Sequence, residues 1–275
     1  MMKTLSDTHN WHQILEISPE LINVVRFTER HVIVERIPVE GDLTPLRNLE
    51  NVIYDNEQLL QDYASCVLVV RNQHFMIVPP EVTSSEQAQA LMSEVLTENT
   101  DEMEIILSED VDNSCCRLLT DDSSANVAMA LPADLLNFLR RTFSNCPIVS
   151  HLKAIISHRL PEVESAQSLL INIEDSHTDL VATDSGSLLL ANTLPTGDPD
   201  DVAFFALKAW ETFNLDQESG TICLRSDMNL DDNTHLMGML KQYVANVVPL
   251  PPFHDKFGRK VDGGNIPLSI ANLIS

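Results

Sequence analysis

The clearest pattern of apolar and polar positions lies in the second half of the chain. Apolar runs at Leu169–Ile173, Thr178–Thr183 and Ser187–Leu194 are separated by short polar turns. Runs of this length, joined by tight turns, predict three consecutive antiparallel strands.

After these three runs, the spacing of the apolar residues changes from that of strands to that of helices. Apolar residues recur every three or four positions at Val202–Phe213 and again at Asn233–Ala245, which predicts two amphipathic helices. Short apolar runs at Thr221–Leu224 and Asn246–Pro249 predict two further strands. The predicted order is therefore β-β-β-α-β-α-β.

The first half of the chain repeats this order less clearly. The predicted strands are Leu21–Phe27, His31–Ile37, Cys66–Val70, His74–Val78, Cys116–Leu119, Asn126–Ala130 and Pro147–Ser150, and the predicted helices are Ser85–Leu96, Ala133–Phe143 and Leu152–His158. Two related α/β lobes fit a length of 275 residues better than one domain. We expect an N-terminal lobe at residues 18–160, a C-terminal lobe at residues 161–252 and a tail at residues 253–275.

The charge of the chain narrows the classes of partner. Lysine and arginine number 17 against 41 aspartates and glutamates, which gives a formal net charge of −24. Binding to nucleic acid or to an anionic membrane needs a basic face, so this balance argues against both. The five cysteines are irregularly spaced, which indicates free thiols and no zinc site. The amino terminus lacks the apolar run of a signal peptide, and we expect a cytoplasmic protein.

The acidic residues are concentrated in two stretches. Ten carboxylates and no lysine or arginine lie between Asn72 and Cys116, and nine lie between Leu160 and Leu207, again without a basic residue. Such stretches are either solvated faces that keep a protein soluble or a docking face for a basic partner protein. Composition leaves both explanations open.

Two stretches, Ser65–Arg159 and Leu169–Leu250, resemble a family of bacterial proteins whose function is unassigned. The likeness is carried by three segments: a strand-turn-strand with a Val-Pro step at Cys66–Pro80, a helix-strand-helix at Leu131–Ile156, and a meander that ends in an Asn-Thr pair at Leu169–Asp201. That family is similar to the actin-like ATPases, in which each half is a ribonuclease H-type α/β unit. The resemblance implies an α/β fold of two ribonuclease H-like lobes with actin-like ATPase architecture.

The resemblance also identifies candidate site residues. Active actin-like ATPases hold nucleotide phosphates with two loops of the form Asp-x-Gly-x-Gly-x-Thr, whose glycines let backbone N–H groups approach the phosphates. In the second loop of this chain the acid is replaced by Asn172, and the glycines are replaced by Glu174 and Ser176. Only Thr178 and the following Asp179 remain.

The other nucleotide contacts implied by the resemblance are altered as well. The first loop, taken as Asn23–Arg30, contains neither glycine nor aspartate, and Leu224–Asp227 stands where a Gly-Gly pair contacts adenosine. A carboxylate such as Glu174 at ~4 Å from a phosphate costs about 4 kcal/mol at an effective dielectric constant of 20. Millimolar binding amounts to only about 4 kcal/mol, so one such carboxylate cancels a weak nucleotide site.

The sequence therefore favours a noncatalytic, actin-like pseudo-ATPase that binds another protein, with no catalytic residues, no metal and no cofactor. The partner is unknown, with a basic protein favoured, and a homodimer is left open. The alternative is a divergent nucleotide-dependent phosphotransferase or ATPase that uses Asp179 or Glu174 to hold Mg²⁺. A nuclease-like hydrolase with clustered carboxylates is disfavoured by the acidic charge.

Overall fold

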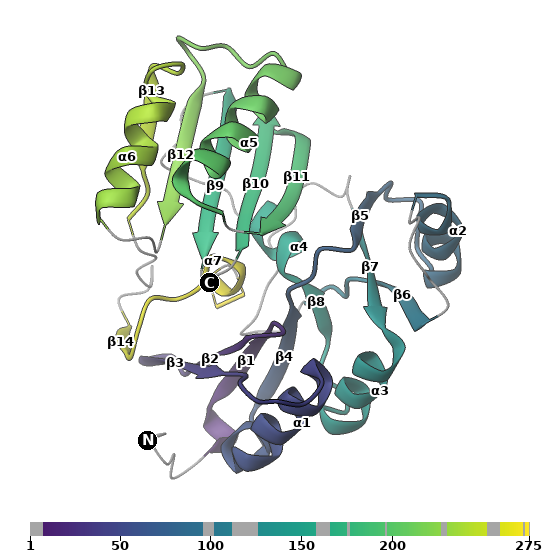
Figure 1. Cartoon of the computed structure of the whole chain (residues 1–275). Coiled ribbons are helices and arrows are strands. Elements are labelled where there is room, and N and C mark those ends of the chain that lie inside the picture. Colours follow the sequence, from purple (N-terminus) through teal and green to yellow (C-terminus); the bar gives the residue numbers. More distant parts are fainter. Residues whose placement is uncertain are drawn as a thin grey trace. The chain divides into compact units, whose positions relative to one another are not determined.

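The computed structural model describes residues 8–95, 102–111, 126–157, 166–174, 177–195, 197–226, 230–251, 259–271 and 273–274. The chain divides into two compact units (Figure 1), and each is described by itself. The first unit comprises residues 1–157 and 253–275, and the second comprises residues 158–252.

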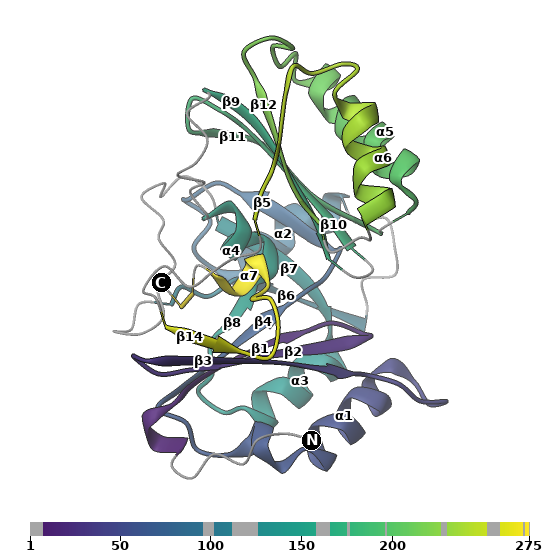
Figure 2. The same cartoon turned by 90° about the vertical axis from the view of Figure 1, so that its left-hand side faces the viewer.

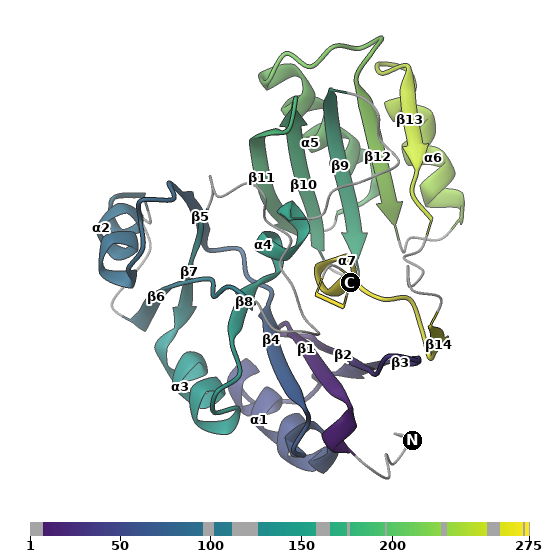
Figure 3. The ribbon, with the colours of Figure 1, turned by 180° about the vertical axis from the view of Figure 1, so that it is seen from behind.

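The first unit is built on a six-stranded sheet with the strand order β14-β3-β2-β1-β4-β8. The strands are β1 (His12–Ile17), β2 (Leu21–Phe27), β3 (His31–Pro38), β4 (Ser65–Val70), β8 (Ile148–Ser150) and β14 (Lys260–Asp262). The first three strands form an antiparallel meander, whereas β4 pairs in parallel with β1 and with β8 (Figure 3).

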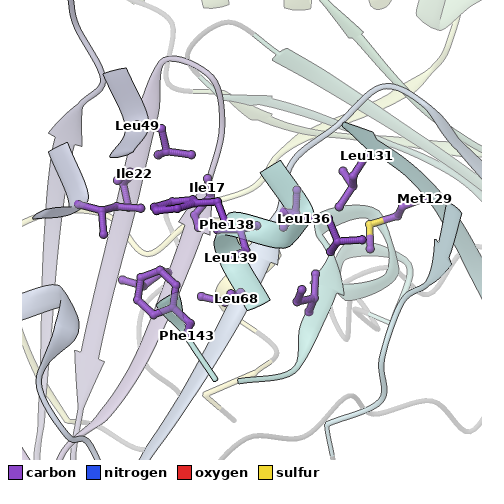
Figure 4. Packing of buried hydrophobic residues seen from close by; sticks show 14 of the residues in the cluster. Ile17, Ile22, Leu49, Leu68, Met129, Leu131, Leu136, Phe138, Leu139 and Phe143 are labelled. Carbon is purple, nitrogen blue, oxygen red and sulfur yellow. The ribbon is translucent and has the colours of Figure 1, made fainter. Parts of the chain in front are cut away.

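One face of this sheet is covered by two helices, α1 (Pro45–Asp55) and α3 (Ala133–Thr142). The α1 helix begins where the Thr44 hydroxyl accepts a hydrogen bond from the Arg47 backbone N–H, with a proline in the first turn. Phe138 and Leu139 of α3 pack with Ile17 of β1 in this core (Figure 4). The apolar stripes of both helices are thereby buried.

The opposite face of the sheet is covered by the last part of the chain. Helix α7 (Leu268–Ala271) contacts α4 (His151–Ile156) and β1, and its Ile270 lies in a cluster with Ile14 and Val69 of the sheet. The segment expected as a separate tail, residues 253–275, therefore contributes β14 and α7 to the first unit. Its apolar residues lack a helical period long enough to be recognised from the sequence, yet they complete a core.

A smaller sheet also belongs to the first unit. Strands β5 (Phe75–Val78), β7 (Asn126–Pro132) and β6 (Met103–Leu107) are antiparallel neighbours in that order, and α2 (Ser85–Val95) packs on them. The strand predicted at residues 116–119 lies outside the described residues.

The second unit follows the order predicted from its sequence pattern. Its sheet has the order β11-β10-β9-β12-β13, with α5 (Pro199–Thr212) and α6 (Leu230–Leu240) side by side on one face (Figure 2). The strands are β9 (Gln167–Glu174), β10 (His177–Asp184), β11 (Ser187–Pro195), β12 (Thr221–Ser226) and β13 (Asn246–Pro249). The Asp198 carboxylate caps α5 by accepting hydrogen bonds from the backbone of Asp200 and Asp201.

The two large sheets share one topology. If each is numbered in chain order, both have the strand order 3-2-1-4-5, and β14 is an addition to the edge of the first. The first hairpins also share one register, because Glu16 pairs with Asn23 in β1–β2 and Asn172 pairs with Asp179 in β9–β10. Each of these pairs encloses six residues, so the hairpins are equivalent position by position.

The part of the chain that the structure describes contains no helix that could cross a membrane. None of the helices there combines the length and the apolar character that crossing a bilayer requires.

Replacement of Ile270 by alanine tests the packing of α7 as core. Ile270 is fully buried, and truncation of a buried isoleucine to alanine removes about 2–5 kcal/mol of unfolding free energy. Urea unfolding of the full chain measures this loss. Leu43→Ala, at an exposed leucine of the same unit, is the control and is expected to change little. Equal stabilities of the two variants would contradict the placement of α7.

Candidate functional site

The candidate site is the first hairpin of each unit, where the resemblance places the phosphate loops. In the second unit the hairpin joins β9 to β10, and Asn172 and Asp179 are cross-strand neighbours. Ser176, together with Asp175, lies outside the described residues. The flanking strands nevertheless fix the surroundings of the other four candidate residues.

Asn172 and Asp179 form a buried, hydrogen-bonded pair. The Asn172 Nδ2 donates to Asp179 Oδ2 at 3.1 Å, and the Thr193 hydroxyl of β11 donates to Asp179 Oδ1 at 2.9 Å. Asp179 has 0% of its surface exposed. Both carboxylate oxygens therefore accept hydrogen bonds inside the sheet, and neither faces solvent.

Glu174 and Thr178 are also buried. Glu174 Oε1 lies 4.0 Å from Nη2 of Arg225, a buried residue of β12. Arg225 belongs to the segment that stands in place of the adenosine-contacting glycines, so that segment supplies a cation to this carboxylate. Opposite charges at this distance attract each other more strongly inside a protein than they do in water.

The first loop lies at a different place from the one expected. Residues 23–27 belong to β2, and the turn of the first hairpin is formed by Ser18, Pro19 and Glu20. The Ser18 backbone N–H donates to the Leu21 carbonyl and closes this turn. The expectation of Asn23–Arg30 was wrong because β1 carries Gln13 and Glu16 among its apolar residues, so the run does not show the pattern of a buried strand.

In the corrected register, the residue of the first unit that is equivalent to Asn172 is Glu16. Its Oε2 accepts a hydrogen bond from Asn23 Nδ2 at 2.7 Å. Its Oε1 accepts one from Arg71 Nη2 at 3.0 Å and another from the Ser269 hydroxyl of α7. Glu16 is only 2% exposed, so this carboxylate is enclosed by β1, β2, the end of β4 and α7.

These contacts also determine the ionisation of Glu16. Burial raises the pKa of Glu16, but the charge of Arg71, the hydrogen bonds from Ser269 and Asn23, and the nearby His151 ring lower it by more. The pKa of Glu16 therefore lies below that of an ordinary glutamate, and the group is ionised when the protein is folded.

The carboxylate and the amide occupy opposite strands in the two hairpins. In the first unit the carboxylate is on the first strand and the amide on the second, whereas the second unit has Asn172 on the first strand and Asp179 on the second. In both units the amide Nδ2 donates to the carboxylate. In each of these two cross-strand pairs the carboxylate therefore accepts a hydrogen bond from the amide opposite it.

The carboxylates of the two hairpins are not placed to bind a magnesium nucleotide. Mg²⁺ takes carboxylate oxygens that reach it with near-octahedral geometry, whereas the oxygens of Glu16 and Asp179 are buried and accept protein donors. Within the described ranges, no cluster of three or more histidine, cysteine, aspartate or glutamate side chains could hold a metal ion.

Comparison with known proteins places the chain in a family. A family profile described as "Protein of unknown function (DUF3822)" matches residues 24–247. The chain belongs to the DUF3822 family. No match is found among the curated proteins.

Solved structures identify the fold of this DUF3822 protein. A Bacteroides thetaiotaomicron protein of unknown function with an actin-like ATPase fold superposes with a TM-score of 0.74 and 17% sequence identity, over 91% of this chain and 94% of that one. The PilM-PilN type IV pilus biogenesis complex matches with a TM-score of 0.49 and 14% identity, over 90% and 89% of the two chains. The ethanolamine utilization protein EutJ of Carboxydothermus hydrogenoformans matches with a TM-score of 0.40 and 11% identity, over 96% and 89%.

The first of these similarities shows the fold and nothing about activity. The DUF3822 protein has an α/β, actin-like ATPase fold, and the expectation drawn from the resemblance is confirmed. The sequence interpretation missed Glu16, Arg71 and Ser269. A single polar residue inside the apolar run Ile14–Ile17 was the available signal, because a charged residue buried in a strand requires a partner.

Replacement of Arg71 by methionine is expected to destabilise the protein by about 3–5 kcal/mol, because it leaves the Glu16 charge buried without its cation. Urea unfolding measures the change. Arg47→Met is the matched control, since Arg47 is 70% exposed in its pair with Glu50 and such surface pairs contribute about 0.2–1 kcal/mol. Similar losses in the two variants would contradict the assignment of a buried ion pair.

The stability advantage of the wild type over Glu16→Gln is expected to depend on pH. A carboxyl group whose pKa is lowered by folding contributes stability above its unfolded pKa, about 4.3, and loses that contribution as the pH falls through the folded pKa. The difference in unfolding free energy between the two proteins should therefore shrink below a pH of about 4.3. A difference that stays constant from neutral to acidic pH contradicts an ionised, internally paired Glu16.

Proposed function

We propose that this DUF3822 protein is a noncatalytic actin-like protein, which retains the two-unit scaffold, holds no nucleotide and acts by binding another protein. The observation that supports the loss of nucleotide binding is the burial of both hairpin carboxylates. Glu16 and Asp179 accept five hydrogen bonds between them from Asn23, Arg71, Ser269, Asn172 and Thr193.

The energies involved support the same conclusion. To bind a metal ion, Glu16 has to leave Arg71, and disruption of a buried pair costs about 3–5 kcal/mol. Millimolar affinity corresponds to about 4 kcal/mol, so this cost alone offsets a weak nucleotide site. In the second unit, Glu174 adds a further negative charge beside the hairpin.

The charge of the second unit favours a protein as the partner. Residues 158–252 contain 4 lysines and arginines against 15 aspartates and glutamates. Nucleic acid and anionic membranes are repelled by such a surface, whereas a basic protein is attracted to it. A homodimer is disfavoured because two copies of charge −24 repel each other. A cytoplasmic location belongs to the same proposal.

A divergent phosphotransferase or ATPase is the second candidate function. It requires Asp179 or Glu174 to reach Mg²⁺, and Asp179 has no exposed surface while Glu174 is buried beside Arg225. The actin-like ATPase fold favours this candidate, and the burial of its two carboxylates disfavours it.

Titration calorimetry of the full chain with Mg-ATP tests this proposal. We expect no saturable heat at nucleotide concentrations up to about 1 mM, because the hairpin carboxylates are occupied by protein donors. Micromolar binding that is lost in Asp179→Asn and kept in Asp184→Asn, at the other end of β10, would show the proposal to be wrong.

A further inference from the structure

A groove of about 990 Å³ lies on the second unit beside helix α5. Phe204, Leu207 and Trp210 of α5 line it, together with Glu218 of the following loop and Tyr243 after α6. We call this feature the α5 groove. Among the described residues of the β9–β10 hairpin, only Gln167, at the start of β9, lines it, and none of the described candidate phosphate-loop residues does.

The burial pattern of α5 is unusual for a helix that covers a sheet. A helix of this kind normally places its large apolar side chains inward and its small or polar ones outward. Here Phe204 is 63% exposed, and Phe205 beside it is exposed as well. The buried positions of α5 hold Val202, Ala203, Ala206, Ala209 and Trp210.

The exposed aromatic rings form a patch at the groove. The rings of Phe204 and Phe205 are in an edge-to-face arrangement with centroids 5.4 Å apart. Tyr243 is 56% exposed and lines the groove with Phe204. Clustered exposed aromatic side chains on a soluble protein mark interaction surfaces, and tyrosine and tryptophan are the residues enriched at their centres.

Internal hydrogen bonds fix the loop that forms one wall of the groove. The Asp216 carboxylate accepts from the backbone N–H groups of Glu218 and Ser219 and from the Ser219 hydroxyl. The side chain of Gln167 accepts from the Asp216 backbone, and Asn246 Nδ2 donates to the Glu218 carbonyl. The wall is therefore preformed, which lowers the entropy that a ligand must overcome on binding.

A glycine lets the floor of the groove pack closely. A Cβ atom on Gly220 would lie 2.8 Å from the ring of Trp210, so any other residue there would displace the indole. Trp210 is only 3% exposed. The buried indole thus forms a closely packed part of the groove lining, which also includes the exposed rings of Phe204 and Tyr243.

The charged residues that line the groove are mostly acidic. Glu211, Asp216 and Glu218 are acidic and Lys208 is basic. Lys208 donates to Glu211 at 2.9 Å and the two charges offset each other, so Asp216 and Glu218 carry the net negative charge of the lining. An apolar floor with an acidic rim is complementary to a ligand that has an apolar centre and basic flanks.

We propose that the α5 groove binds a short segment of a partner protein, in which an apolar or aromatic anchor is flanked by lysines or arginines. This proposal rests on the protein-binding part of the proposed function and is independent of nucleotide loss. A second copy of this chain would bring its own charge of −24 to an acidic rim, which favours a basic partner over self-association.

Fluorescence anisotropy with a synthetic probe tests the α5 groove. The probe is a fluorescein-labelled peptide of about 14 residues, with leucines at helical spacing and lysines elsewhere. The full chain should bind it saturably, and binding should weaken as salt rises above about 0.15 M. The same peptide with glutamate in place of every lysine should not bind.

Variants of the full chain localise the binding. The double variant Phe204→Ala/Tyr243→Ala should bind the lysine peptide at least about tenfold more weakly, since anchor residues of an interface contribute on this scale. Leu230→Ala is the matched control, because Leu230 is an exposed apolar residue of the same unit outside the groove lining. All three side chains are exposed, so urea midpoints should match the wild type.

Each other outcome has a defined meaning. Binding of the lysine peptide that survives Phe204→Ala/Tyr243→Ala overturns the α5 groove and leaves the protein-binding function standing. No saturable binding to the wild type, or equal binding of the glutamate peptide, also overturns the α5 groove. A dimer in sedimentation that dissociates in the double variant assigns the groove to a second copy and contradicts the proposal. Mg-ATP binding beside peptide binding would overturn only the noncatalytic part of the proposed function.

Discussion

The hydrogen-bonded ion pair between Glu16 and Arg71 joins parts of the first unit that are far apart in the chain. Glu16 lies on β1, Arg71 follows β4, and Ser269 of α7 closes the group from a separation of 253 residues. A buried charge without these donors costs several kcal/mol, so the sheet, the end of β4 and α7 depend on one another. The helix that completes the core therefore also occupies the side of the sheet to which Glu16 points.

The duplication of the fold explains why the two hairpins can be compared position by position. An Asp-x-Gly-x-Gly-x-Thr loop presents its acid and its backbone to phosphates, whereas here one carboxylate and one amide bind each other in each hairpin. Two carboxylates facing across a hairpin would repel, whereas a carboxylate opposite an amide accepts a hydrogen bond from it. The polar groups of these two pairs thus face the protein interior, and the α5 groove is a surface on a different element.

Much of the second unit could be predicted from the sequence, because its strands are apolar runs separated by short polar turns and α5 begins at a distinct cap, Asp198. The start of the first unit could not, since Gln13 and Glu16 break the apolar pattern of β1 although both are buried. The candidate positions Asn172 and Asp179 proved to be direct neighbours. The roles of Arg71 and Ser269 could not be predicted from the sequence. They depend on contacts between segments separated by 55 and 253 residues, and no local sequence pattern indicates such contacts.

Paramagnetic broadening by Mn²⁺ tests most directly whether the hairpin carboxylates are committed to the protein interior. Side-chain carboxyl resonances of Glu16 and Asp179 would be recorded by NMR while Mn²⁺ and ATP are added to the full chain. We expect these two resonances to broaden no more than those of the other carboxylates, because a carboxylate enclosed by protein donors does not bind the ion. Selective broadening of either one at low Mn²⁺ would place a metal at the hairpin and show that its carboxylate is available to a ligand.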